Sequence, residues 1–137
     1  MGVERLDQLL RAAGDATRLR LLNLLRFGKI CVSDLQAVLG IPQPTVSRHL
    51  AVLRNAGLVS DSRRGTRIIY GLLDRKAPQV EALRELLDKC CPLDERMWAD
   101  FERFELAVRS GKCRVEQDDV ATSESDQPEG SSVKTPL

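Results

Sequence analysis

The side chains best suited to chemistry in this sequence are its four cysteines, Cys31, Cys90, Cys91 and Cys113. Cys90 and Cys91 are adjacent, and neighbouring Cα atoms about 3.8 Å apart lie below the usual disulfide window of about 4.4 to 6.8 Å. The pair is therefore predicted to remain two free thiols at a helix end. Trivalent arsenic is soft and takes three ligands in a pyramid. We predict As(III) binding by Cys90 and Cys91, with Cys113 as third ligand for the inorganic form, whereas methylarsenite needs only the pair.

Other chemistry for the thiols is left open or disfavoured. Cys31 lies two residues before Ser33, and a hydroxyl is a poor donor to a soft centre, so Cys31 is predicted to be a small buried hydrophobic residue. A thiol-redox or persulfide response that pairs Cys31 with Cys90 or Cys91 is the alternative. The sequence has neither a Cys-x-x-Cys motif nor the spacing of a cysteine paired with a basic residue, which disfavours a thiol oxidoreductase. His49 is the only histidine, which disfavours a zinc site. We predict no enzyme activity and no catalytic cofactor.

A second set of side chains suits a nucleic acid. From Arg48 to Arg67 the sequence has five arginines and one acid, Asp61, and guanidinium groups match phosphate oxygens and guanine edges. A helix predicted over 42–57 opens with polar side chains that can read base edges in a major groove, and a hairpin beyond it has a basic tip. The predicted DNA contacts are Gln43, Thr45, Ser47, Arg48, His49 and Arg54 on the helix, and Arg63, Arg64, Thr66 and Arg67 on the hairpin.

Helical and strand periodicities place these side chains in an α-α-α-α-β-β-α-α order. A first helix over 6–13 is followed by a second over about 16–27, which Asp15 caps and which is apolar enough to lie in the core. Ser33 and Gln36 have the spacing of a capping box for a third helix, 33–39, which forms a helix-turn-helix with the fourth, 42–57. β-Prone runs within 58–72 predict a hairpin, and a fifth helix from 78 ends at Cys91 because of Pro92. A sixth helix carries an apolar stripe of Met97, Phe101, Phe104 and Val108.

Composition and charge bound the class of protein. With 137 residues, of which 42% are hydrophobic and 30% charged, the chain fits one globular domain. It has neither an apolar run of about 18 residues nor an apolar N-terminal signal, so we expect a cytoplasmic protein with reduced thiols and no membrane partner. Residues 115–137 carry six acids and one base, so residues 1–114 carry +6, which suits an anionic partner. We predict a DNA-binding and dimerisation domain over 1–92, a helical extension over 93–113 and an acidic tail over 114–137, disordered from about Glu116.

Four segments in order resemble the ArsR/SmtB family of winged helix-turn-helix repressors. They are Asp15-Ala-Thr-Arg-Leu-Arg-Leu-Leu, Cys31-Val-Ser-Asp-Leu, the segment from Gln43 to Val59, and Arg64-Gly-Thr-Arg-Ile-Ile-Tyr-Gly-Leu. The resemblance covers about Leu6 to Cys91. It implies a mainly α fold with a small β-hairpin wing, and a homodimer that pairs through its first and fifth helices on a palindromic DNA operator. Independently of the family, the apolar stripes over 6–13 and 80–87 need a covering surface, which a two-fold dimer supplies.

The resemblance also implies a repressor that leaves DNA when a metal, metalloid or thiol-reactive signal binds. The arsenic-sensing archetype of the family has a second cysteine where this chain has Ser33, whereas some members carry a vicinal pair after the fifth helix, as Cys90 and Cys91 are here. We therefore predict a repressor of arsenic resistance genes, with arsenite, a methylated arsenical or antimonite as inducer. An architectural DNA-binding protein without a ligand is the remaining alternative.

Overall fold

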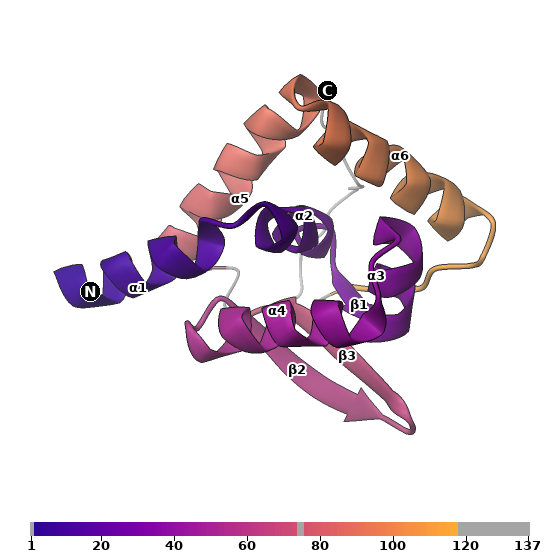
Figure 1. The fold of residues 1–137 in the computed structure, drawn as a ribbon, viewed down its shortest axis with the longest axis horizontal. Helices are drawn as coiled ribbons and strands as arrows, with labels where there is room; N and C mark the ends of the chain where they lie inside the picture. Colours follow the sequence, from indigo (N-terminus) through magenta and orange to yellow (C-terminus); the bar gives the residue numbers. More distant parts are fainter. Residues whose placement is uncertain (1, 74–75, 118–137) are drawn as a thin grey trace, which may run out of the picture.

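The computed structural model describes residues 2–73 and 76–117, which form helices around a small antiparallel sheet (Figure 1). The helices are α1 (Val3–Ala13), α2 (Ala16–Leu25), α3 (Val32–Leu39), α4 (Gln43–Asn55), α5 (Pro78–Cys90) and α6 (Glu95–Arg109), and a short 3-10 helix, η1 (Cys91–Leu93), joins α5 to α6. The strands are β1 (Lys29–Cys31), β2 (Val59–Arg64), β3 (Arg67–Leu72) and β4 (Val115–Glu116), in the sheet order β2-β3-β1-β4.

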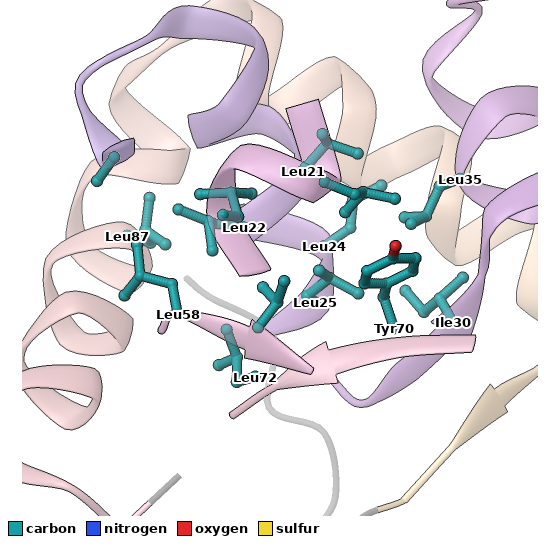
Figure 2. Close-up of a cluster of buried hydrophobic side chains, with 14 of the residues drawn as sticks. Leu21, Leu22, Leu24, Leu25, Ile30, Leu35, Leu58, Tyr70, Leu72 and Leu87 are labelled. Atoms are coloured by element: carbon teal, nitrogen blue, oxygen red, sulfur yellow. The ribbon is translucent and has the colours of Figure 1, made fainter. Parts of the chain in front are cut away.

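Helix α2 is the centre of the hydrophobic core, as its sequence predicts. It begins at the Asp15 cap, whose carboxylate accepts a hydrogen bond from the backbone N–H of Arg18 at 3.0 Å. Figure 2 shows the α2 leucines flanked by Leu87 of α5 and by Tyr70 of the sheet. Four of them have no exposed surface: Leu21, Leu22, Leu24 and Leu25. Because α2 is buried on so much of its circumference, a movement of α2 is transmitted to the other elements.

Helices α3 and α4 form the predicted helix-turn-helix. Gly40 ends α3 with φ of +69°, a left-handed conformation that a residue with a Cβ disfavours. Helix α4 then packs inward through Val46, Leu50 and Leu53, which are fully buried at spacings of four and three residues. The other faces of α4 are thereby left toward solvent.

The predicted capping box at the start of α3 is wrong. The residue that precedes the helix is Cys31, so Ser33 already lies in the first turn and its side chain caps nothing. Its hydroxyl is instead 3.3 Å from the Cys31 thiol. The reason is β1, a strand that the sequence pattern does not predict. Pairing of Cys31 with Ile69 of β3 holds the chain extended up to Cys31, and the helix begins immediately after it.

Strands β2 and β3 form the predicted wing, with a register that runs from Val59 opposite Leu72 to Arg64 opposite Arg67. Strand β4 is a correction to the predicted tail over 114–137. Its two residues pair with β1, with Val115 opposite Ile30 and Glu116 opposite Lys29, so the chain remains part of the sheet up to Glu116. The rest of the predicted tail, 118–137, lies outside the described residues.

Helix α6 packs on the same core as the helix-turn-helix. Met97, Phe101 and Phe104 are buried, and the ring of Phe27 lies 5.4 Å from that of Phe101 and 5.5 Å from that of Phe104. Val108, the last member of the predicted apolar stripe, is 38% exposed because the final turn of α6 extends past the core. Helix α5 ends at Cys90, one residue before the predicted end, but Cys91 keeps α-region dihedrals (φ −52°, ψ −49°), so the predicted effect of Pro92 on Cys91 is wrong. Instead η1 continues the chain and forms the corner between α5 and α6 that is visible in Figure 1.

A buried carboxylate joins α6 to α2 and α3. Asp100 has no exposed surface, and its oxygens accept hydrogen bonds from Arg20 Nε at 2.7 Å and from Arg103 Nη2 at 2.6 Å. The same two arginines donate to the last carbonyl groups of α3, Arg20 to Leu39 O at 3.3 Å and Arg103 to Val38 O at 2.9 Å. These bonds satisfy carbonyl groups that have no partner within the helix, so α6 holds the C-terminal end of α3 in place.

Helices α1 and α5 each present leucine side chains to solvent. On α1, Leu10 is 58% exposed and Leu6 is 41% exposed, and on α5 Leu86 is 55% exposed. Leu6 and Leu10 belong to the predicted stripe over 6–13. The prediction that the stripe over 80–87 needs an external covering surface is wrong, because Val80, Leu83 and Leu87 are buried in the core of the same chain, and Leu86 is not part of that stripe. Within the described part of the chain, no helix combines the length and the apolar character needed to cross a membrane.

Candidate DNA interface and thiol site

The outer face of α4 carries the predicted base-reading residues. Val46 and Leu50 point into the core, and Ser47 and Arg48 between them point away from it. Gln43, Ser47 and Arg48 are exposed, whereas Thr45 is half-buried. The exposed set offers one amide, one hydroxyl and one guanidinium group, which suits the donor and acceptor pattern of a major groove.

His49 is engaged inside the protein. Its Nδ1 lies 3.1 Å from Nη1 of Arg18 and 4.0 Å from the Asp15 carboxylate, and its side chain is mostly buried. The hydrogen bond from the backbone of Arg18 is the main cause that lowers the pKa of Asp15, with the Arg18 and His49 charges acting in the same direction. His49 therefore links α4 to the start of α2, a role that sequence spacing did not indicate.

Arg54 connects α4 to the wing. Its Nη1 donates to Asp61 Oδ2 at 3.1 Å and to the Tyr70 hydroxyl at 3.2 Å. Burial raises the pKa of Tyr70, so its hydroxyl stays protonated at neutral pH. The contacts orient the wing relative to α4. The Arg54 guanidinium already bonds within the fold, so contact with DNA would have to share its N–H groups with Asp61 and Tyr70.

The four residues predicted for the wing fall into two groups, two that are exposed and two arginines that have partners within the protein. Arg63 and Thr66 are exposed near the turn, whereas Arg64 forms an ion pair with Glu116, with Nη1 and Oε1 2.8 Å apart. Arg67 lies closer to the body of the protein, and its pKa is raised first by a hydrogen bond with Cys31 and then by neighbouring charges. The basic tip predicted from sequence is present, but two of its arginines already have partners.

We predict that Arg48→Ala weakens binding to a cognate operator by about 10- to 100-fold, because the exposed guanidinium on α4 suits a base edge. Competition assays with operators changed one base pair at a time would show reduced discrimination at one position in each half-site. Arg109→Ala, which removes an exposed arginine from α6, is the matched control and should change affinity little. An equal loss in both variants would mean that Arg48 acts only through net charge.

Cys90 and Cys91 occupy the corner between α5 and α6. Cys90 ends α5 and is half-buried, whereas Cys91 begins η1 and has no exposed surface. The Cys91 thiol accepts from Asn23 Nδ2 at 3.5 Å and donates to the Met97 carbonyl at 3.6 Å. The vicinal thiols are thus close in space to α2, α5 and α6.

Arg26 of α2 is a neighbour of Cys91 that sequence reasoning missed. It lies in the core over the Phe27 ring, donates to Asp88 Oδ1 at 3.0 Å and to Asn23 Oδ1 at 2.8 Å, and interacts with the Cys91 thiol. Burial lowers the pKa of Arg26, while the charges of Cys91 and Asp88 oppose that shift. Sequence spacing indicated no basic partner for a cysteine, but the fold supplies one from 65 residues away, and no local motif signals such a contact.

The structure does not bring Cys113 to the vicinal pair. Cys91 precedes α6 and Cys113 follows it, and the 15 residues of α6 span about 22 Å. Cys113 is buried near Asp34 and Cys31, and its pKa is raised to about 12, mainly by burial, so the thiol is protonated at neutral pH. Cys31 is buried, as its prediction requires. Within one described chain, no cluster of three or more His, Cys, Asp or Glu side chains forms a metal site.

A helix-turn-helix followed by a basic two-stranded wing defines a winged helix-turn-helix DNA-binding protein. Residues 15–61 match the family described as bacterial regulatory protein, arsR family. Over 104 residues the chain is 35% identical to the arsenical resistance operon repressor of Escherichia coli (strain K12), covering 75% of this chain and 81% of that protein.

Solved structures agree with this match. HlyU from Vibrio cholerae N16961 is similar with a TM-score of 0.56 and 32% identity, over 61% of this chain and 88% of HlyU. The homodimeric winged helix-turn-helix domain of Mb0332 from Mycobacterium bovis, a possible ArsR-family regulator, has a TM-score of 0.56 at 27% identity, over 62% of this chain and 79% of that one. The chain belongs to the arsR family of transcriptional regulators, which are DNA-binding proteins rather than enzymes.

Proposed function

We propose that the protein is a homodimeric repressor that releases its operator when trivalent arsenic binds Cys90 and Cys91. The observation that carries the proposal is the position of two adjacent free thiols at the α5–η1–α6 corner, one half-buried and one sealed against α2. The relative named arsenical resistance operon repressor supports the choice of arsenic. The response takes place in a reducing cytoplasm, where the thiols are free.

The DNA half of the proposal assigns the exposed face of α4 to the major groove and the wing to the adjacent backbone. Gln43, Ser47 and Arg48 supply base contacts, and Arg63 and Thr66 supply contacts at the wing tip. A dimer formed through the exposed leucines of α1 and α5 presents two such faces about one duplex turn apart, which matches a palindromic operator. The homodimeric relative from Mycobacterium bovis supports this assembly.

The ligand half uses only the two thiols. Arsenous acid, As(OH)₃, exchanges two of its hydroxyl groups for the sulfurs of Cys90 and Cys91; two As–S bonds form, two As–O bonds break, and the thiol protons leave in two waters. The third position keeps a hydroxyl group, or a methyl group in methylarsenite. Because Cys113 lies at the far end of α6, we assign it no part in the site of the same chain. Antimonite offers the same exchange chemistry.

Arsenic capture changes the structure because Cys91 has to leave its buried position. The sulfur gives up its contacts with Asn23 and the Met97 carbonyl, and Arg26 loses a neighbour inside the core. The corner η1 then shifts relative to α2, and with it the end of α5, which carries the dimer face, and the start of α6, which holds α3. The spacing of the two α4 helices no longer fits the operator, and a differential of several kcal/mol between the two states suffices for release.

The test is fluorescence anisotropy of an operator duplex titrated with arsenite. We expect the unmodified protein to dissociate, and the Cys90→Ser plus Cys91→Ser variant to stay bound at every arsenite concentration. The matched control is Cys31→Ser plus Cys113→Ser, which removes the other two thiols and should keep the response. Release of the Cys90/Cys91 variant by arsenite would overturn the assignment. An intramolecular disulfide with no arsenic adduct in mass spectra would favour the redox alternative instead.

A further inference from the structure

The C-terminal segment joins the fold directly beside the wing. Strand β4 pairs with β1, which pairs with β3, so Glu116 lies at the edge of the sheet to which the wing belongs. The Glu116 carboxylate is 2.8 Å from Nη1 of Arg64, and its side chain is 26% exposed. Glu116 also contributes to the raised pKa of Arg67 through its charge. One acidic residue thus faces two arginines that are predicted to contact DNA.

The backbone is shaped to accept β4 at this position. Gly28 has φ of +151°, and a Cβ there would lie 2.6 Å from Val115 Cγ1 and 2.8 Å from the Glu116 carbonyl oxygen. Such distances are too short for any side chain, so the close approach of β4 depends on glycine. The Arg114 backbone N–H also donates to Asp34 Oδ2 at 3.1 Å. The contact between Glu116 and the wing is therefore fixed by the strand that carries it.

More acidic residues follow Glu116. Asp118 and Asp119 come two and three residues later in the sequence. Glu124, Asp126 and Glu129 add three more carboxylates. Carboxylates and phosphates present the same paired oxygens to a guanidinium group. The Glu116 carboxylate therefore gives Arg64 the same kind of contact that a DNA phosphate would give it.

We propose that Glu116 occupies the wing arginine Arg64 in the DNA-free protein and competes there with DNA phosphates. The inference rests on the proposed function in one respect, that the wing contacts DNA. Because Glu116 is part of the same chain, its effective concentration at the wing is high and does not depend on protein concentration. A random duplex offers mainly phosphates and has to displace the carboxylate, whereas an operator also gains base contacts from α4. The Glu116 contact thereby weakens non-specific binding more than specific binding.

A double-mutant cycle on the full chain tests this proposal. Glu116→Gln, Arg64→Gln and their combination are titrated by anisotropy against a duplex from immediately upstream of the protein's own coding sequence and against a shuffled duplex of the same composition. We expect Glu116→Gln to tighten binding to the shuffled duplex by about three- to fivefold at low salt, and to have a much smaller effect once Arg64 is absent, because only the charge of Arg67 then remains near Glu116.

The control separates direct competition from a change in net charge. Glu102→Gln, on the exposed side of α6, also removes one negative charge, but from a residue outside the wing. Its effect on affinity for the shuffled duplex should be the same with and without Arg64. If Glu116→Gln behaves as Glu102→Gln does, the inference is overturned while the proposed function stands. If the unmodified protein binds neither duplex, the proposed function fails and the inference falls with it. Thermal unfolding of each variant confirms that the fold is retained.

Discussion

Asp100→Asn is expected to lower the free energy of unfolding by about 3 to 5 kcal/mol, the largest loss that we predict for a single polar substitution. The carboxylate has no exposed surface, and it is bonded to Arg20 and Arg103. An amide in its place leaves Arg20, whose side chain is only 14% exposed, without a compensating charge. Urea unfolding followed by circular dichroism measures the change, with Glu102→Gln on the exposed face of α6 as the control.

The same substitution should also weaken operator binding at temperatures where the protein stays folded. Arg20 and Arg103 donate to the Leu39 and Val38 carbonyls, so loss of Asp100 loosens the end of α3 on which α4 depends. A loss of stability below about 1 kcal/mol would show that the arginines find other partners in the variant, and that the buried carboxylate is not what holds α6 to α3.

Leu10→Glu is expected to convert the protein to a monomer at micromolar concentration. Leu10 is 58% exposed on α1, in a stripe that the proposed dimer covers. In a two-fold interface each substitution occurs twice, so losing two leucines at about 1.5 kcal/mol each raises the dimer dissociation constant by about 100-fold before charge repulsion is added. Sedimentation velocity measures the assembly, and operator affinity should fall with it.

Leu106→Glu is the matched control for that substitution. Leu106 is 61% exposed on α6, which the proposed interface does not use, so the variant should remain a dimer. If both variants are dimeric, the interface lies elsewhere. If both are monomeric, α6 takes part in the dimer interface. A shift of the α5–η1–α6 corner on arsenic binding would then act on that interface directly.

Local patterns were sufficient to predict the elements with strong periodicity. The leucine-rich stretch before Phe27 could only be a buried helix, the Asp15 cap follows from its position, and the runs around Gly65 could only be a hairpin. Strands β1 and β4 have three and two residues, too short to show an alternation. They exist because β3 offers an edge to β1, and β1 in turn offers an edge to β4. The misplaced capping box at Ser33 has the same origin, since strand pairing overrode a local preference.

The candidate site was predictable where it depends on residue type and not where it depends on distant contacts. The exposed face of α4 follows from the helical period, so Gln43, Ser47 and Arg48 were correctly placed on the surface. Engagement of His49 by Arg18 and of Arg64 by Glu116 joins residues 31 and 52 positions apart, which no spacing rule covers. The separation of Cys113 from Cys91 required the length and direction of α6.

If arsenic binds as proposed, the unequal exposure of the two adjacent thiols sets how fast the protein responds. A reagent in solution can reach half-buried Cys90 in the native state, but it reaches Cys91 only when the corner around η1 opens. Arsenic would therefore bind in two steps, with one reversible As–S bond to Cys90 first and the bond to Cys91, which closes the ring, second. A lag measured between arsenite addition and operator release would then report how often the η1 corner opens. Thiol-binding reagents that meet Cys90 only briefly would dissociate before the second bond forms.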